Sequence, residues 1–362
     1  MLSKRWSSVW LMALCGIVAL ALVVGCAPKL TPETKPPETK PPEVKPIVLK
    51  WCDTSVGSSR TRAIEATCLE IEKRTGGRVK HEFYWAGSLV KAMDSLEAIK
   101  VGTAQGGGAP DIVYHPAQFP IWQFGMLQFT IGPDIPAAMK AAYEMYQTFP
   151  ELKDEMDKQG VKFLNTYLYP TTIISTKPIN KLEDLKGLRV RAVGSIAKWF
   201  AKEGGTASGI TFYEVTEALA RGTIDATIGY LYAHYAYKFH DYCKYWVSTP
   251  IGNTHIFQSW VNLDTFNKFP EDIKKIYVET WRDFYPEMVA KYTEEEVNIQ
   301  LKAFKDAGVK SIELTPEEYT RWKDSAAFLN DDYYAAMSKA GIDGKKILSS
   351  YEELYKKYET KK

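Results

Sequence analysis

The sequence predicts an α/β protein with two lobes and a long helix that bridges them. Short apolar runs alternate with amphipathic segments from Val48 onward, a pattern typical of a largely parallel sheet covered on both faces. A second set of such elements follows the first, and the 315 residues from 48 to 362 are too many for one core. The stretch Pro270–Lys302 is helical, long and of mixed polarity, which favours a helix between lobes over one buried in a single core.

The first set of elements begins with an apolar run at Val48–Cys52, whose length suits a buried strand. Ser58 or Ser59 is placed to cap the helix that follows, and Gly76-Gly77 ends it at about Thr75. Beyond this helix the sequence predicts strands at 79–85 and 111–114 and a helix at 91–101.

The second set includes a strand at Leu188–Ala192 and an amphipathic helix at Thr211–Arg221, which ends at Gly222. In the long helical stretch Pro286 is the expected bend, because proline removes a backbone donor. The other predicted elements are strands at 161–169, 172–175, 224–229 and 255–261 and a mostly helical tail at 315–362.

Residues 1–25 are typical of a signal peptide. Lys4 and Arg5 precede Val9–Val24, 16 residues without a charge, which is short for a membrane span but suits the apolar core of a leader. The run ends in Leu22-Val23-Val24-Gly25-Cys26, which resembles the lipobox of bacterial lipoproteins, where the cysteine is lipidated and becomes the N-terminus. The alternative is an uncleaved anchor with a chance cysteine.

Residues 26–47 predict a tether rather than a folded domain. Three related pentads fill 32–46, each beginning with Pro-Glu and ending in Lys-Pro. Proline fixes φ and removes donors, so the tract favours polyproline II and spans roughly 45 Å when extended. Together with lipid on Cys26, this spacer indicates a folded domain held off a membrane, in the periplasm or at the cell surface.

Composition and motifs exclude several classes of function. Without residues 1–25 the chain has 44 basic and 44 acidic residues, so it lacks the field that gathers nucleic acid. No nucleophile elbow, phosphate loop, dinucleotide fingerprint or zincin motif occurs, and the five histidines lack metal-site spacing, so no cofactor or metal is expected. Gly106-Gly107-Gly108 predicts a flexible connection. Cys52 and Cys68 are either a disulfide or two small buried side chains.

Four stretches, taken in order, resemble the DctP-type solute-binding proteins of TRAP (tripartite ATP-independent periplasmic) transporters. They are Ala86–Leu89 with Glu97–Thr103, Thr176–Ile179 with Leu182–Arg191, Gly209–Val215 with Ala218–Asp225, and Val261–Asp264 with Phe269–Ile273. The resemblance implies a two-lobed periplasmic-binding-protein fold without enzymatic activity. Its lobes are expected at 48–168 plus about 257–297, and at 169–256 plus about 298–362.

Arg191 is the principal candidate for binding a solute. It stands at the end of its predicted strand, where ligands of open α/β sheets lie. Its guanidinium group can bind a carboxylate by donating two parallel hydrogen bonds. The resemblance implies that it is the family's carboxylate-binding arginine. Arg189, on the same strand face but farther from the rim, is expected to be a surface residue.

The chain departs from the family at two polar positions. A second arginine is replaced at about Thr171, and Ala226–Tyr230 stands where many members have Gly-Gln-Glu-Asn-Pro. Aromatic residues surround both positions: Tyr167, Tyr169, Phe212, Tyr213, Tyr230 and Tyr232. The expected ligand is therefore a monocarboxylate with an apolar or aromatic body, with two or three of these rings reaching it.

The candidate ligand contacts beside Arg191 come from both lobes. Phe212 is expected to stack on the ligand, Tyr169 and Tyr230 to make side contacts, and Tyr114 and Thr54 to approach from the ends of first-lobe strands. The expected partners are a small organic acid, the small and large permease subunits, and the membrane through the lipid. The alternatives are an extracytoplasmic enzyme, or a ligand-sensing protein on a similar two-lobed scaffold.

Overall fold

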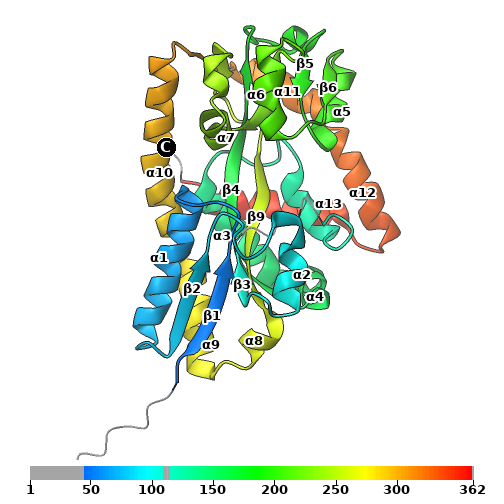
Figure 1. Ribbon diagram of the computed structural model, residues 1–362. Helices are drawn as coiled ribbons and strands as arrows, with labels where there is room; N and C mark the ends of the chain where they lie inside the picture. Colours follow the sequence, from blue (N-terminus) through cyan, green and yellow to red (C-terminus); the bar gives the residue numbers. More distant parts are fainter. Residues whose placement is uncertain (1–44, 109–111, 113–114, 361–362) are drawn as a thin grey trace, which may run out of the picture. The chain divides into compact units, whose positions relative to one another are not determined.

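One 15-residue strand, β4 (Val161–Ser175), takes part in both halves of the sheet. In the computed structural model, which describes residues 45–108, 112 and 115–360, residues 161–170 pair antiparallel with β9 (Asn253–Asn262). Residues 171–175 pair antiparallel with β7 (Ala226–Tyr230) instead. Pro170, which cannot donate a backbone hydrogen bond, stands at this change of partner. The two strands expected at 161–169 and 172–175 are therefore one (Figure 1).

The first lobe contains the strands in the order β2-β1-β3-β9-β4. β1 (Ile47–Cys52) is parallel to both β2 (Val79–Tyr84) and β3 (Gly106–Gly107), whereas β3 and β4 are antiparallel to β9. The sheet is thus mixed rather than largely parallel. Residues 1–44, with Cys26, lie outside the described residues, as does most of the strand expected at 111–114.

The glycines of β3 are required by packing. A Cβ on Gly106 would lie 2.4 Å from the ring of Trp51, and one on Gly108 would lie 2.3 Å from the side chain of Ile64. Real Cβ atoms do not approach so closely, so only glycine lets this segment fit between β1, β9 and the helix α1 (Ser59–Arg74). The expectation of a flexible connection at 106–108 is wrong for this reason: Gly106 and Gly107 form a sheet strand.

The second lobe contains the order β4-β7-β5-β6, with β8 (Tyr245–Val247) pairing β4 and β10 (Lys310–Ile312). β5 (Arg189–Arg191) is parallel to β7 and to β6 (Thr206–Ser208). Successive strand residues face opposite sides of a sheet, and Ile173 and Ile174 accordingly belong to two separate hydrophobic cores.

Helices cover the strands of both lobes. α1 begins as the sequence predicts: the Ser58 side chain accepts from the backbone N–H of Thr61, and Gly76 ends the helix at φ 62°. The helices are α1 (Ser59–Arg74), α2 (Ser95–Lys100), α3 (Ile135–Thr148), α4 (Pro150–Lys158), α5 (Ser195–Lys202), α6 (Phe212–Ala220), α7 (Leu231–Ala236), α8 (Leu263–Asn267), α9 (Glu271–Glu279), α10 (Tyr285–Asp306), α11 (Pro316–Ala326), α12 (Leu329–Lys339) and α13 (Gly344–Tyr358). Short 3₁₀ turns lie at Ala92–Asp94, Ile121–Met126, Leu182–Leu185 and Phe239–Asp241.

α10 is the helix that connects the lobes. It packs on α1 and α3 of the first lobe and on α7 of the second, and Figure 1 shows it alongside α1. Val289 belongs to the first-lobe core, whereas Phe304 belongs to a second-lobe core. A π-helical turn at Thr280–Phe284 directly precedes α10, and Pro286, the expected bend, stands in the first turn of α10 beside this irregularity.

The C-terminal helix α13 packs on α3 of the first lobe. We expected the stretch from about 298 to 362 to belong with the second lobe. The buried stripe Ile347, Leu348, Tyr351 and Tyr355 instead joins the first-lobe core, because these residues recur at helical spacing on the face of α13 that meets α3.

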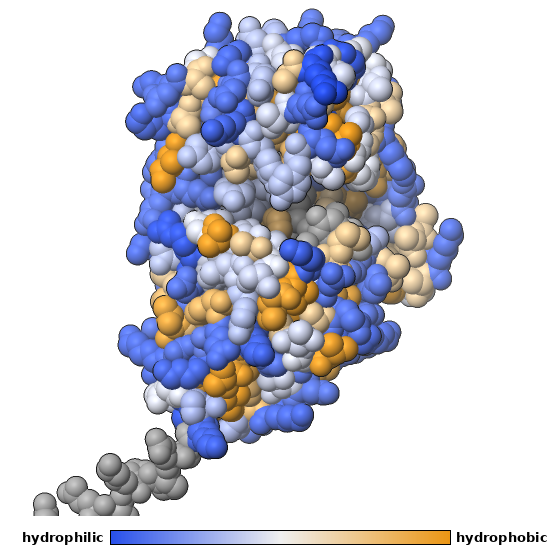
Figure 2. Space-filling view, in the orientation of Figure 1, coloured by the Kyte–Doolittle hydropathy of each residue, from blue (hydrophilic) through white to orange (hydrophobic). Residues whose placement is uncertain are grey.

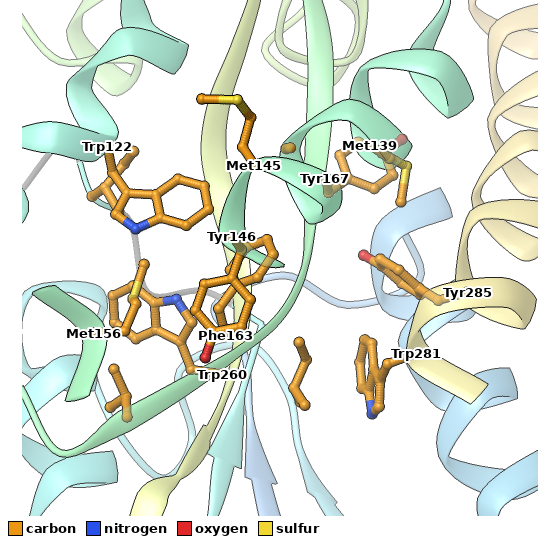
Figure 3. Packing of buried hydrophobic residues seen from close by; sticks show 14 of the residues in the cluster. Trp122, Met139, Met145, Tyr146, Met156, Phe163, Tyr167, Trp260, Trp281 and Tyr285 are labelled. Atoms are coloured by element: carbon orange, nitrogen blue, oxygen red, sulfur yellow. The ribbon is translucent and has the colours of Figure 1, made fainter. Parts of the chain in front are cut away.

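Aromatic side chains dominate the first-lobe core (Figure 3). Trp122 and Phe163 lie with ring centroids 4.7 Å apart, and Trp281 stacks on Trp51 at 5.2 Å. Cys52, Cys68 and Cys243 are free thiols and are buried, so Cys52 and Cys68 form no disulfide. They pack as small apolar side chains in the cores.

The surface drawn in Figure 2 is mainly hydrophilic, with hydrophobic residues in separate patches. Among the described residues, no helix combines the length and apolar character needed to span a bilayer. No group of three or more histidine, cysteine, aspartate or glutamate side chains in the described part of the chain is arranged to hold a metal ion.

Candidate functional site

Arg191 closes β5 and is almost entirely buried, with 9% of its surface exposed. Its Nε donates to the carbonyl of Ile210 at 2.9 Å, and Nη1 donates to that of Ile228 at 3.3 Å. The guanidinium carbon lies 4.0 Å from the ring centroid of Phe212, within cation–π distance. Two backbone carbonyls and one ring face therefore fix the plane of this cation.

Arg189, two residues earlier, has a different role. It is about half exposed, and its Nε and Nη2 donate to the two carboxylate oxygens of Asp225 at 2.9 Å each. This pairing lowers the pKa of Asp225, with further help from the backbone N–H of Arg189 and from Lys177. Arg189 thus holds the start of β5 against the segment before β7.

Phe212 is the first residue of α6, whose start is fixed by a capping box. The backbone N–H and hydroxyl of Thr211 both donate to the Glu214 carboxylate at 2.7 Å. Gly229 of β7 lets the ring approach, because a Cβ there would lie 3.0 Å from it. The neighbouring His234 is fully buried, which lowers its pKa to about 3, so its neutral ring adds no charge beside Arg191.

Five rings from five elements form what we call the aromatic cluster: Phe212, Tyr230, Tyr169, Tyr232 and Phe257. The Phe212 ring meets Tyr230 edge-on at 5.9 Å, Tyr230 stacks on Tyr169 at 4.3 Å, and Tyr169 lies 6.1 Å from Tyr232 and 5.7 Å from Phe257. Tyr169 is 7% exposed, and the other four are half-buried. The cluster therefore extends from Phe212, which contacts Arg191, to Phe257.

Two of the six aromatic residues singled out from the sequence lie elsewhere. Tyr167 is fully buried, and its hydroxyl bonds to the Ser59 hydroxyl at 2.6 Å and to that of Thr293 at 2.9 Å. It thereby joins β4 to the start of α1 and to α10. Tyr213 is 82% exposed and meets only the edge of Tyr237 among the ring contacts of the described residues.

The other two candidates are Thr54 and Tyr114. Thr54 is the second residue after β1 and is half-buried, next to Asp53 in the chain. Tyr114 lies outside the described residues.

A buried ion pair beside Thr54 was missed by sequence reasoning. Arg60 donates from Nη2 to Oδ1 of Asp53 and to the Ser55 hydroxyl at 2.8 Å each, and from Nη1 to Oδ2 of Asp53 and the carbonyl of Gly108. Arg60 is 1% exposed. Although burial favours its neutral form, Asp53 raises the pKa of Arg60, so the guanidinium stays charged.

The ion pair is adjacent to the aromatic cluster, since the Arg60 guanidinium lies 4.3 Å from the ring centroid of Phe257. The sequence held a signal for Arg60: it stands at helical spacing from the buried Ile64, Cys68 and Ile71 of α1, on the stripe that faces the core. A charged residue on such a stripe requires a buried partner, and Asp53 is that partner.

A separate groove of about 620 Å³ lies between α3 and the beginning of α10. Lys140, Tyr143, Arg282 and Pro286 are among its lining residues, and none of the residues predicted to bind a solute lines it.

The structure thus combines a fixed guanidinium at a strand end with a wall of aromatic rings drawn from both lobes. A fold of two α/β lobes with a cation at a strand end is the one expected of a two-lobed solute-binding protein. The chain belongs to the family described as "Bacterial extracellular solute-binding protein, family 7" (DctP), which matches residues 54–337.

Curated relatives agree with this assignment. A solute-binding protein of Albidiferax ferrireducens is 21% identical over 282 residues, which are 75% of this chain and 80% of that protein. A monocarboxylate 2-oxoacid-binding periplasmic protein of Nostoc is 24% identical over 228 residues, 59% of each chain.

Solved structures share the fold. A TRAP periplasmic solute-binding protein of Desulfovibrio salexigens has 27% identity and a TM-score of 0.78, covering 87% of this chain and 98% of its own. A marine metagenome TRAP protein specific for aromatic acids, in complex with metahydroxyphenylacetate, has 20% identity and a TM-score of 0.75, covering 87% of this chain and 100% of its own. A Rhodoferax ferrireducens protein in complex with benzoate has 20% identity and a TM-score of 0.73, covering 86% and 98%. The chain is therefore a DctP-type solute-binding protein of the TRAP class.

Proposed function

We propose that this protein captures an aromatic monocarboxylate and delivers it to a TRAP-type importer. The observation that carries the proposal is the contact of Arg191 with Phe212 at one end of the aromatic cluster. The guanidinium binds the carboxylate through charge-assisted hydrogen bonds, and Phe212, Tyr230 and Tyr169 enclose the flat body of the ligand. Because Arg191 is buried, water and salt screen this interaction little.

The aromatic wall favours an aromatic acid over a sugar acid. A uronate presents several hydroxyls, each of which needs a polar partner when it leaves water. Related TRAP proteins span both classes: one binds benzoate, and another, of Sulfitobacter, binds galacturonate. Here rings occupy the positions around Thr171 and Tyr230 where the family's further polar anchors would stand, so an aromatic body makes the better fit.

Delivery of the ligand to the permease depends on a motion of the two lobes. We propose that one lobe comprises 48–168 with about 257–297 and α13, and that the other comprises 169–256 with most of 298–343. Ligand that touches Phe212 of one lobe and Phe257 of the other stabilises the closed arrangement, which the permease subunits then recognise. Strands β4 and β9 and helix α10, which pass between the lobes, take up the motion.

The chain's location follows from its first 47 residues. We propose that Cys26 carries lipid after residues 1–25 are removed, and that the proline-rich tether holds the domain at the membrane, in the periplasm or at the cell surface. Mass spectrometry of the protein from a membrane fraction should give an N-terminal peptide with acylated Cys26. Retention of residues 1–25 in the protein from the membrane fraction, or release of the protein from membranes without detergent, would contradict lipid anchoring through Cys26.

Calorimetric titration of the purified protein with benzoate tests the ligand class. Arg191→Ala should weaken binding by about 2–5 kcal/mol, roughly thirty-fold to several thousand-fold, because a desolvated carboxylate loses its partner. Arg221→Ala is the matched control, since this exposed arginine pairs only with Glu217 among the described ion pairs. Equal affinities in wild type and Arg191→Ala, with unchanged melting temperatures, would rule out the proposal.

A further inference from the structure

Glu296 of α10 lies beside the aromatic cluster, at the end away from Arg191. Its Oε2 accepts from the backbone N–H of Ser59 at 3.1 Å, and the Ser59 hydroxyl bonds to that of Tyr167. The Tyr167 ring is 4.6 Å from Tyr169, which stacks on Tyr230. Contacts therefore run in series from Arg191 through the rings to Glu296.

Glu296 has no ion-pair partner among the described residues, whereas the charged groups around it do. Arg60 is neutralised by both oxygens of Asp53, and Arg62 pairs with Glu295 at 2.5 Å. Within the described part of the chain Glu296 has no ion pair, although it is half-buried. Its carboxylate therefore contributes a negative charge near the rings that no direct ion pair neutralises, and Arg62 and Arg60 act on this charge only from a greater distance.

The negative charge of Glu296 acts on Tyr232, a residue of the second lobe. Burial raises the pKa of Tyr232, and the Glu296 carboxylate raises it further. Burial likewise raises the pKa of Glu296 itself, because part of its surface is removed from water. α7, which carries Tyr232, packs on α10, which carries Glu296.

We propose that Glu296 determines specificity at the end of the ligand opposite the carboxylate: it accepts a hydrogen bond from a ring hydroxyl and excludes a second carboxylate. The inference rests on the proposed function, because Arg191 must first orient the ring. A phenolic hydroxyl donates to a carboxylate, which is a strong acceptor. A second carboxylate has no proton to offer and is repelled by the unpaired charge. The preferred ligands are therefore hydroxylated aromatic monocarboxylates.

The test compares five acids by calorimetric titration of the purified protein: benzoate, 3-hydroxybenzoate, 4-hydroxybenzoate, isophthalate and terephthalate. The wild type should bind one hydroxybenzoate about tenfold or more tightly than benzoate, and both dicarboxylates more weakly than benzoate. Glu296→Gln should improve the binding of dicarboxylates about tenfold or more, and Glu296→Leu should also abolish the advantage of the hydroxyl. Glu295→Gln, one residue away on the exposed face, should behave as the wild type.

The outcomes separate this inference from the one it depends on. If benzoate binds and requires Arg191, but the hydroxyl and dicarboxylate ratios are the same in Glu296→Gln, Glu296→Leu and wild type, Glu296 has no role in specificity and the proposed function stands. If none of the five acids binds the wild type, the aromatic acid assignment fails and this inference fails with it. The melting temperatures of the Glu296 variants show whether a change in affinity comes instead from destabilisation of the fold after the hydrogen bond between Glu296 and Ser59 is lost.

Discussion

The rings of Tyr169 on β4 and Tyr230 on β7 stack at 4.3 Å with an interplanar angle of 14°. Their strands pair only from Thr171 onward, so this contact lies at the point where β4 passes from one part of the sheet to the other. An aromatic ligand placed against Tyr230 therefore touches a residue whose neighbours belong to both lobes.

Replacing Tyr230 by alanine should weaken benzoate binding about tenfold, because one aromatic contact contributes about 0.5–1.5 kcal/mol beyond the area it buries. Calorimetric titration measures the change. Tyr213→Ala is the control, since Tyr213 is 82% exposed and should leave the affinity as it is. If both variants lose affinity to the same extent, Tyr230 does not line the site.

Asp53→Asn should destabilise the fold by about 3–5 kcal/mol, because it leaves the buried Arg60 without its counterion. Urea unfolding at pH 7 gives the free energy. The control is Glu295→Gln, which breaks an exposed pair with Arg62 and should cost less than about 1 kcal/mol. A similar small loss in both variants would mean that Arg60 finds another partner or water.

Gly106→Ala should destabilise the protein by about 1–3 kcal/mol through the clash of its Cβ with Trp51. Thermal melting shows the effect as a lower midpoint. Gly209→Ala places its Cβ in open space and should leave the midpoint nearly unchanged. Equal midpoints for the two variants would show that β3 can shift away from β1 without cost.

The contribution of Glu155 to the free energy of unfolding should fall as pH rises from about 4.5 to 7. This carboxyl accepts from the backbone N–H groups of Ile121 and Trp122, and burial raises its pKa from 4.5 to about 7. A carboxyl whose pKa is higher in the folded state stabilises the fold while protonated, and that stabilisation is lost as pH rises through the folded-state value.

At about 1.4 kcal/mol for each pH unit between the two values, the loss amounts to about 3 kcal/mol by pH 8. Glu155→Gln does not titrate and keeps one acceptor oxygen for these N–H groups, so its unfolding free energy should fall less between pH 5 and pH 8. Urea unfolding at the two pH values measures both slopes. Parallel slopes for wild type and variant would show that Glu155 is ionised in the fold throughout.

The pattern of the chain predicted most elements because they depend on local chemistry. The apolar run before Cys52, the Ser58 cap and the glycines after Thr75 give β1 and α1 nearly to the residue. The pairing of strands was not predictable in this way. Gly106 forms a strand only because Trp51 and β9 lie on either side of it, and nothing in the local sequence states that.

The candidate site was predictable where one residue carries the signal. Arg191 stands out as a charge at a strand end, and Phe212 as the residue that opens a helix. Phe257 and Glu296 did not stand out, because each looks ordinary on its own element. Their importance comes from neighbours that are distant in sequence: Arg60 beneath Phe257 and Ser59 beside Glu296.

The passage of β4 through both parts of the sheet has a consequence for dissecting the molecule. The sheet of each lobe includes part of the same strand, β4. The first lobe also contains α13, which lies at the C-terminal end of the chain. No single cut in the polypeptide yields two halves with complete sheets. Fragments ending near residue 170 should be insoluble when expressed separately, and only coexpressed fragments should restore a receptor.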